Sequence, residues 1–189
     1  MNLLSSQDYS FIGGHLAKFG IDVMHHTTQK MTVPENATLE LSRHSRDSGS
    51  HMVYRTKSLD QFKSWVGNPD HVFDANTIYT GKHPSRMLDH RVPTASLTSE
   101  DWENLEHAAK GYIWGPSHVF AASKMAVEAH VPLETVVHVY SQLVVNGTLV
   151  FNDGKSNTLV VGKLIYGPNG LITGDTNLTI YASQIIRAN

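Results

Sequence analysis

The chain has 189 residues, of which 40% are hydrophobic and 17% are charged, and its formal net charge is −2 at pH 7. This length and apolar content suit one domain, or one domain with a small addition. The near-neutral charge argues against a nucleic-acid-binding protein, and no apolar run reaches the roughly 18 residues of a membrane span. The lack of cysteine excludes disulfides, thiolate metal sites and cysteine nucleophiles.

Histidine is unusually frequent, with 12 residues against 15 lysines and arginines. An unperturbed imidazole titrates near pH ~6.5, so the net charge would change strongly between neutral and mildly acidic pH. We therefore expect pH-sensitive behaviour. The N-terminus lacks the basic and apolar segments of an ordinary secretory signal. The compartment stays open, including secretion or surface association without such a signal.

Two strands are predicted in the first third of the chain. Apolar residues alternate with polar ones at Met31 and Val33 and again at Leu39 and Leu41, on either side of a turn at 34–36. A short strand is expected at 51–56 after a polar loop at 42–51. Glycines at 13, 14 and 20 argue against a long helix in the first 28 residues.

The middle of the chain predicts two helices. One covers 57–68, with Ser58 as its N-cap. The other covers 98–111, where Thr98 and Asp101 have the spacing of a capping box and Gly111 is the expected stop. The segment between them is irregular.

The last third of the chain repeats short β-branched runs separated by Gly and Asn corners. Similar runs begin at Thr135, Thr158 and Asn177, which are 23 and 19 residues apart. From Val119 onward, the ambiguous segment 120–130 is the only one with a helical character. The expected inward-facing residues are Val137, Val139, Leu143, Val145, Leu149, Phe151, Leu159, Val161, Ile165, Leu178 and Ile180.

These runs fit a β-sandwich of hairpins or a β-solenoid with parallel strands, and we favour the solenoid. Residues 117–187 resemble the coils of parallel β-helix proteins, which include adhesins, tailspikes and polysaccharide lyases. The expected fold class is mainly β with minor α. The expected division is a mixed α/β portion and cap at 1–116 and a short solenoid at 117–189, folding as one unit.

An open end of such a solenoid would expose a strand edge, which favours pairing with another chain. We therefore predict a non-enzymatic, adhesin-like or toxin-like protein that forms a homo-oligomer or binds a carbohydrate or protein surface, with no cofactor and no nucleic acid. Aromatic rings stack well on sugars, and the candidate ligand-binding residues are Tyr166, Tyr181 and Trp114.

Two alternative functions remain. Histidine and carboxylate are ligands of metals such as zinc, and His71, Asp74, His83 and His90 cluster in one loop region. They are the candidate metal ligands of a metal-dependent hydrolase or lyase. The other alternative is a secreted toxin or effector that binds membranes after acidification.

Overall fold

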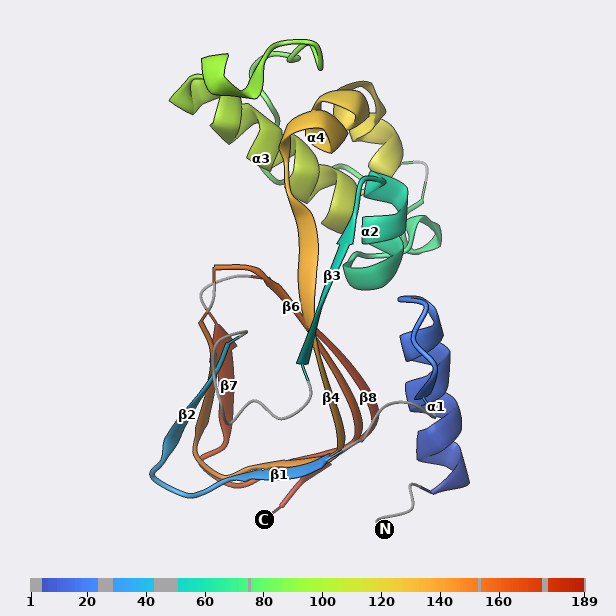
Figure 1. Cartoon of the computed structure of the whole chain (residues 1–189), viewed down its shortest axis with the longest axis vertical. Helices are drawn as coiled ribbons and strands as arrows, with labels where there is room; N and C mark the ends of the chain where they lie inside the picture. Colours follow the sequence, from blue (N-terminus) through green and yellow to red (C-terminus); the bar gives the residue numbers. More distant parts are fainter. Residues whose placement is uncertain are drawn as a thin grey trace. The chain divides into compact units, whose positions relative to one another are not determined.

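The computed structural model describes residues 5–23, 29–42, 51–74, 76–152, 154–174 and 177–188. The chain divides into two compact units (Figure 1). Unit 1 comprises Met1–Tyr54 and Thr135–Asn189, and unit 2 comprises Arg55–Glu134. Unit 2 is therefore one continuous segment of the chain, whereas unit 1 is built from two segments that are distant in the sequence.

Helices and strands contain similar numbers of the described residues. The strands are β1 (Gln29–Val33), β2 (Thr38–Leu41), β3 (His51–Thr56), β4 (Leu133–Val145), β5 (Thr148–Phe151), β6 (Ser156–Tyr166), β7 (Leu171–Gly174) and β8 (Leu178–Arg187). The α-helices are α1 (Ser6–Ala17), α2 (Leu59–Val66), α3 (Ser99–Trp114) and α4 (Lys124–His130). Short 3-10 helices are η2 (Asp70–Val72), η3 (Thr94–Ser96) and η4 (Ser117–Ser123).

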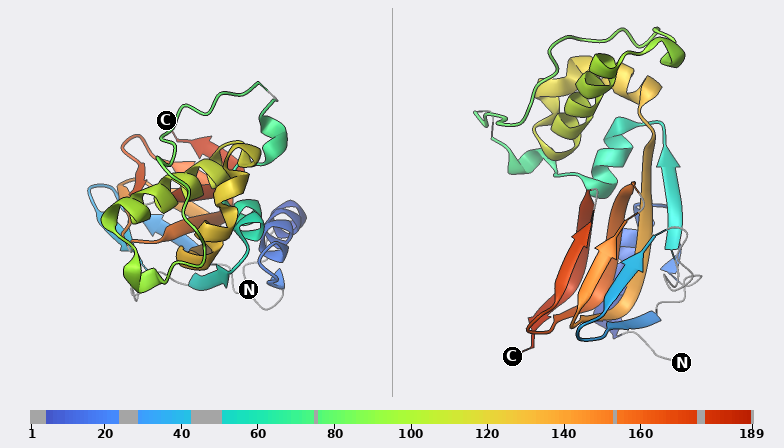
Figure 2. Two further views of the ribbon diagram at one scale, coloured as in Figure 1. Left: turned by 90° about the horizontal axis from the view of Figure 1, so that it is seen from above. Right: turned by 90° about the vertical axis from the view of Figure 1, so that its left-hand side faces the viewer.

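Parallel strands form the two sheets of unit 1. One sheet has the order β1-β4-β6-β8, with β3 also pairing with β4, and the other has the order β2-β5-β7. The two sheets face each other (Figures 1 and 2). The pairs Thr38↔Thr148 and Thr148↔Leu171 fix the register of the second sheet. Each strand of β1, β4 and β6 thus continues through a turn into a strand of the opposite sheet.

The core of unit 1 lies between these sheets. It consists of Val33, Leu41, Tyr140, Leu143, Val145, Leu149, Phe151, Leu159, Val161 and Leu164. Both Val161 and Leu164 belong to it, although residues three apart on a regular strand point to opposite faces. The inward face therefore changes near Gly162, where a Cβ atom would come within 2.6 Å of the Ser141 carbonyl oxygen. As a result Leu164 is buried and the predicted Ile165 is only half-buried.

Helix α1 packs against β6 and β8 in unit 1 (Figure 1). Ser5 caps the helix by accepting a hydrogen bond from the Asp8 backbone N–H at 3.1 Å. Ile12 and Leu16 are fully buried. The glycines made a long helix doubtful in this ambiguous segment, and the helix that forms has 12 residues. It forms because this cap and the burial of two apolar side chains outweigh the low helix propensity of Gly13 and Gly14.

The caps of the helices in unit 2 follow the sequence signals. The Ser58 side chain accepts from the Gln61 N–H, and Thr98 with Asp101 forms the predicted capping box. Gly111 does not end α3, which continues to Trp114. A Cβ atom at Gly111 would lie 2.2 Å from the Phe120 ring, so this glycine provides space for an aromatic contact inside the helix instead of a stop.

The predicted fold class is wrong. The chain is a mixed α/β protein with parallel sheets and about equal helix and strand content, not a mainly β protein with minor α. Residues 117–189 also do not form a β-solenoid or hairpin sandwich of their own. Residues 117–130 are mostly helical, and β4 and β5 pair with β1 and β2 from the first third of the chain. The predicted loop at 42–51 lies largely outside the described residues.

Candidate functional site

The inward-facing residues of unit 1 form columns that run across the strands. One column aligns Met31, Leu143, Leu164 and Ile185. Leu143 and Leu164 are 0% and 1% exposed, but Ile185 on β8 is 66% exposed. The apolar core therefore reaches the surface at the edge of the sheet that β8 forms.

A cavity of about 560 Å³ lies at this end of the sheets. The residues that line it come from the end of β6, the turn before β7, β7 and β8: Tyr166, Gly167, Pro168, Gly170, Leu171, Ile172, Ile185 and Arg187. Leu171 is 53% exposed. We call this surface the β7–β8 end. It is mostly apolar, with Arg187 as its one charged residue.

The turns of unit 1 stack by a repeated hydrogen bond. The Thr148 N–H donates to the Ala37 carbonyl at 2.8 Å, and the Leu171 N–H donates to the Gly147 carbonyl at 2.9 Å. In the next turn Gly170 holds the equivalent position. It comes directly before Leu171 in β7, as Ala37 comes before Thr38 in β2 and Gly147 before Thr148 in β5. Within the described residues no backbone hydrogen bond reaches the Gly170 carbonyl. The stack could therefore accept a further strand at this end.

The opposite end of the sheets differs. Val33 on β1 and Leu41 on β2 are both 0% exposed, although β1 and β2 are edge strands of the two sheets. The apolar residues of β1 and β2 are thus buried or half-buried, including Met31 and Leu39, whereas Ile185 and Leu171 at the β7–β8 end are exposed.

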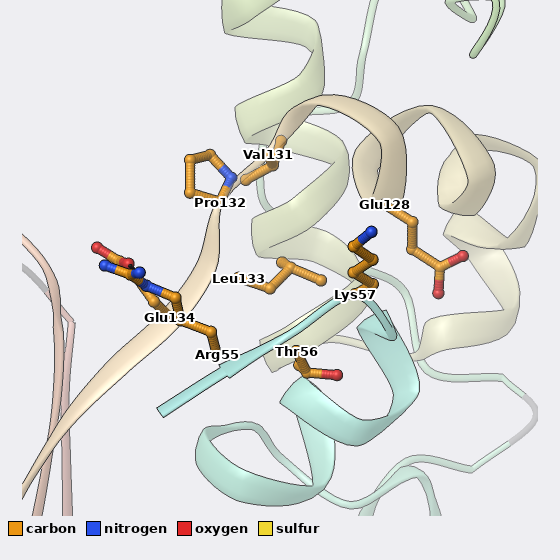
Figure 3. A pocket seen from close by; sticks show the side chains of 8 residues that line it. All are labelled: Arg55, Thr56, Lys57, Glu128, Val131, Pro132, Leu133 and Glu134. Atoms are coloured by element: carbon orange, nitrogen blue, oxygen red, sulfur yellow. Dashed lines mark hydrogen bonds and ion pairs between the residues drawn. The ribbon is translucent and has the colours of Figure 1, made fainter. Parts of the chain in front are cut away.

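A second cavity, of about 590 Å³, lies within unit 2 (Figure 3). It is lined by Arg55, Thr56, Lys57, Glu128, Val131, Pro132, Leu133 and Glu134. The Arg55 Nε donates to the Glu134 carboxylate at 2.7 Å, and Glu134 is only 8% exposed. We call this cavity the Lys57 cavity.

A polar network in unit 2 surrounds Lys63, which is 7% exposed. Its Nζ donates to the carbonyls of Tyr112 and Gly115 at 2.8 and 2.7 Å and lies 2.9 Å from an Asp70 carboxylate oxygen. Burial raises the pKa of Asp70, but hydrogen bonds from Ser117 and Lys63 lower it to about 2. Since every partner of this lysine is satisfied within the fold, we regard it as a structural anchor.

The predicted metal ligands are dispersed. His71 lies exposed on η2, and Asp74 accepts hydrogen bonds from Asn76 and Thr77 of its own turn. The His83 ring stacks on Phe120 at 5.2 Å. His90 lies 3.4 Å from Asp89, its neighbour in the chain. Among the described residues, no three His, Asp or Glu side chains are grouped to hold a metal ion.

The predicted ligand-binding aromatics lie in both units. Tyr166 lines the β7–β8 end. Tyr181 stacks on His15 of α1 at 4.2 Å, so its ring is partly covered, and burial raises its pKa. Trp114 ends α3 in unit 2, where its carbonyl accepts from the Asn68 amide at 2.8 Å. Of the three, Tyr166 therefore lines one of the two cavities described above.

Sequence reasoning missed the Lys57 cavity. Its residues come from 55–57 and 128–134, two segments more than 70 residues apart with no common motif. The pairing of β3 with β4 brings the two segments together. The sequence of 51–56 indicated a short strand but gave no indication of its partner.

None of the helices in the described ranges has both the length and the apolar character needed to cross a lipid bilayer. Comparisons of the chain with protein-family models, with curated proteins and with solved structures gave no match. The resemblance to parallel β-helix proteins thus stays a prediction.

Proposed function

We propose that this protein is a self-associating protein whose β7–β8 end pairs with the same end of a second copy. The observation that carries the proposal is the exposure of Ile185. It continues the column of Leu143 and Leu164, which are fully buried, yet it is 66% exposed. An apolar core column that ends in solvent is stabilised by a partner that covers it.

The sequence of β8 supports pairing at its edge. Edge strands usually carry lysine, proline or a bulge that prevents association. Strand β8 spans ten residues, contains no proline or lysine, and has its one charge at Arg187. Its partner β6 occupies one side only, since β8 ends the order of its sheet.

A second copy is the occupant that the exposure pattern favours. Head-to-tail stacking would place the β7–β8 end on the β1–β2 end. Val33 and Leu41 there are already fully buried and Met31 and Leu39 are half-buried, so this contact would cover less exposed apolar surface. The arrangement that remains joins two β7–β8 ends by a two-fold axis, the commonest symmetry of soluble oligomers. In that arrangement the β8 strands run antiparallel, which keeps the two Arg187 side chains at opposite ends of the pair.

Sedimentation velocity and light scattering on residues 1–189 test this proposal. We expect a dimer at about 100 µM, and we expect Ile185→Lys to weaken dimerisation at least ~100-fold because it places a charge in the apolar contact. Ile78→Lys is the matched control. Ile78 is 84% exposed and lies in unit 2, so this variant should dimerise as the wild type does. A monomeric wild type, or a dimeric Ile185→Lys protein, would contradict the proposal.

A further inference from the structure

The Lys57 cavity is independent of the proposed dimer contact, because all its residues belong to unit 2. Its volume of about 590 Å³ falls within the range of small-molecule sites, roughly 300–1,000 Å³. Figure 3 shows the Lys57 side chain between Leu133 and Glu128, while Arg55 extends to the other side and meets Glu134. The cavity thus has charged groups on its sides and an apolar wall between them.

The charged side chains that line the cavity differ in whether they have a partner within the fold. Glu134 pairs with the Arg55 Nε at 2.7 Å. Glu128 accepts a hydrogen bond from the Leu59 backbone N–H at 2.8 Å and lies 3.9 Å from the Lys124 ammonium. By contrast, no hydrogen bond or ion pair with any residue in the described ranges engages the Lys57 ammonium. Lys57 is solvent-exposed, so its ammonium is accessible to a ligand that enters the cavity.

The wall beside this charge is apolar. Leu133 is 4% exposed, Val131 is half-buried and Pro132 is exposed. A ligand here would contact hydrocarbon with its body and an ammonium with its polar group. The two carboxylates of Glu128 and Glu134 line the same space, and they disfavour a ligand with a second negative charge.

We infer that the Lys57 cavity binds a small organic monoanion in which one carboxylate is attached to an apolar body. The Lys57 ammonium donates to the ligand carboxylate. The side chains of Val131, Pro132 and Leu133 pack against the apolar body. The Arg55 guanidinium lies on the other side of the cavity, where its Nε donates to Glu134, and it takes no part in this contact.

The test is an NMR titration of the full chain with 3-phenylpropionate, compared with uncharged 3-phenylpropanol and with phenyl phosphate. We expect the carboxylate to shift the backbone signals of residues around 55–57 and 131–134. Its affinity should exceed that of the alcohol by about tenfold or more, because a charge-assisted hydrogen bond is lost in the alcohol. Phenyl phosphate, with a charge of about −1.5 to −2, should bind more weakly than the carboxylate.

Three variants separate the charge from the fold. Lys57→Met keeps the length of the side chain and should lose about tenfold in carboxylate affinity, whereas Lys57→Arg should retain it. Lys82→Met, at an exposed position elsewhere in unit 2, should bind as the wild type does. Equal binding of the alcohol, unchanged binding by Lys57→Met, tighter binding of phenyl phosphate, or no binding of 3-phenylpropionate would each overturn the inference.

Discussion

At the level of single residues, the protonation state of His15 is linked to the packing of α1. Its ring stacks on Tyr181 of β8 at 4.2 Å and lies 4.6 Å from the Phe11 ring. Burial lowers the pKa of His15 below 6.5, and the nearby Lys18 lowers it further. The Lys18 ammonium itself lies 5.1 Å from the Tyr181 ring. The folded state therefore opposes protonation of this histidine.

We expect this opposition to make unit 1 less stable in mild acid. The unfolded chain takes up the His15 proton as the pH falls through 6.5, while the folded chain takes it up only at lower pH. The free energy of unfolding should thus decrease from pH 7.5 to pH 5.5. Urea unfolding followed by far-UV circular dichroism at both pH values would measure the decrease.

The His15→Phe variant isolates this effect, because it keeps an aromatic ring on Tyr181 and removes the titration. Its stability should change less between the two pH values than that of the wild type. His118→Gln, at an exposed position on η4, should change as much as the wild type does. If His15→Phe has the pH dependence of the wild type, His15 does not cause it.

At the level of elements, two glycines should respond in opposite ways to the same substitution. A Cβ atom at Gly162 in β6 would lie 2.6 Å from the Ser141 carbonyl oxygen, so Gly162→Ala should destabilise unit 1 by about 1–3 kcal/mol. At Gly14 in α1 a Cβ atom meets nothing within 4 Å, so Gly14→Ala should stabilise the helix by about 0.5–1 kcal/mol. Chemical denaturation measures both, and changes of equal sign would contradict this account.

Elements with strong local signals could be predicted from the sequence. The alternation at 30–41 and the caps at Ser58 and Thr98 indicated β1, β2, α2 and α3 correctly, because those signals lie within a few residues of the element. Helix α1 was missed, since its stability depends on burial against β6 and β8 rather than on propensity. The overestimate of β content followed from this helix and from the mostly helical 117–130.

The sites were less accessible to prediction than the elements. The column that ends at Ile185 depends on the switch near Gly162 in which residues of the strand point into the core, and no sequence pattern marks this switch. The predicted metal ligands were neighbours in the sequence, but turn hydrogen bonds and ring stacking engage Asp74 and His83 individually. Proximity along an irregular segment does not imply a common direction of side chains.

At the level of the whole molecule, the two units offer separate spectroscopic signals. The three tryptophans, Trp65, Trp102 and Trp114, all belong to unit 2. Tryptophan fluorescence therefore reports on unit 2, whereas far-UV circular dichroism reports on both units. Because each unit has its own set of buried residues, we expect the two signals to give different unfolding midpoints in denaturant.

One variant in each unit assigns these transitions. Lys63→Met leaves the Tyr112 and Gly115 carbonyls without their donor and should lower the fluorescence midpoint. Gly162→Ala should lower the other midpoint and leave the fluorescence transition in place. Coincident transitions that both variants shift together would show that the units unfold as one.

The discontinuity of unit 1 also determines the order in which its parts can form during synthesis. Unit 2 is complete once Glu134 has been translated. At that point β1 and β2 have existed for about a hundred residues without their partners, since Gln29 pairs with Tyr140 and Thr38 with Thr148. We therefore expect the middle of this chain to fold first during synthesis, before its N-terminal strands can pair with the residues that follow position 134.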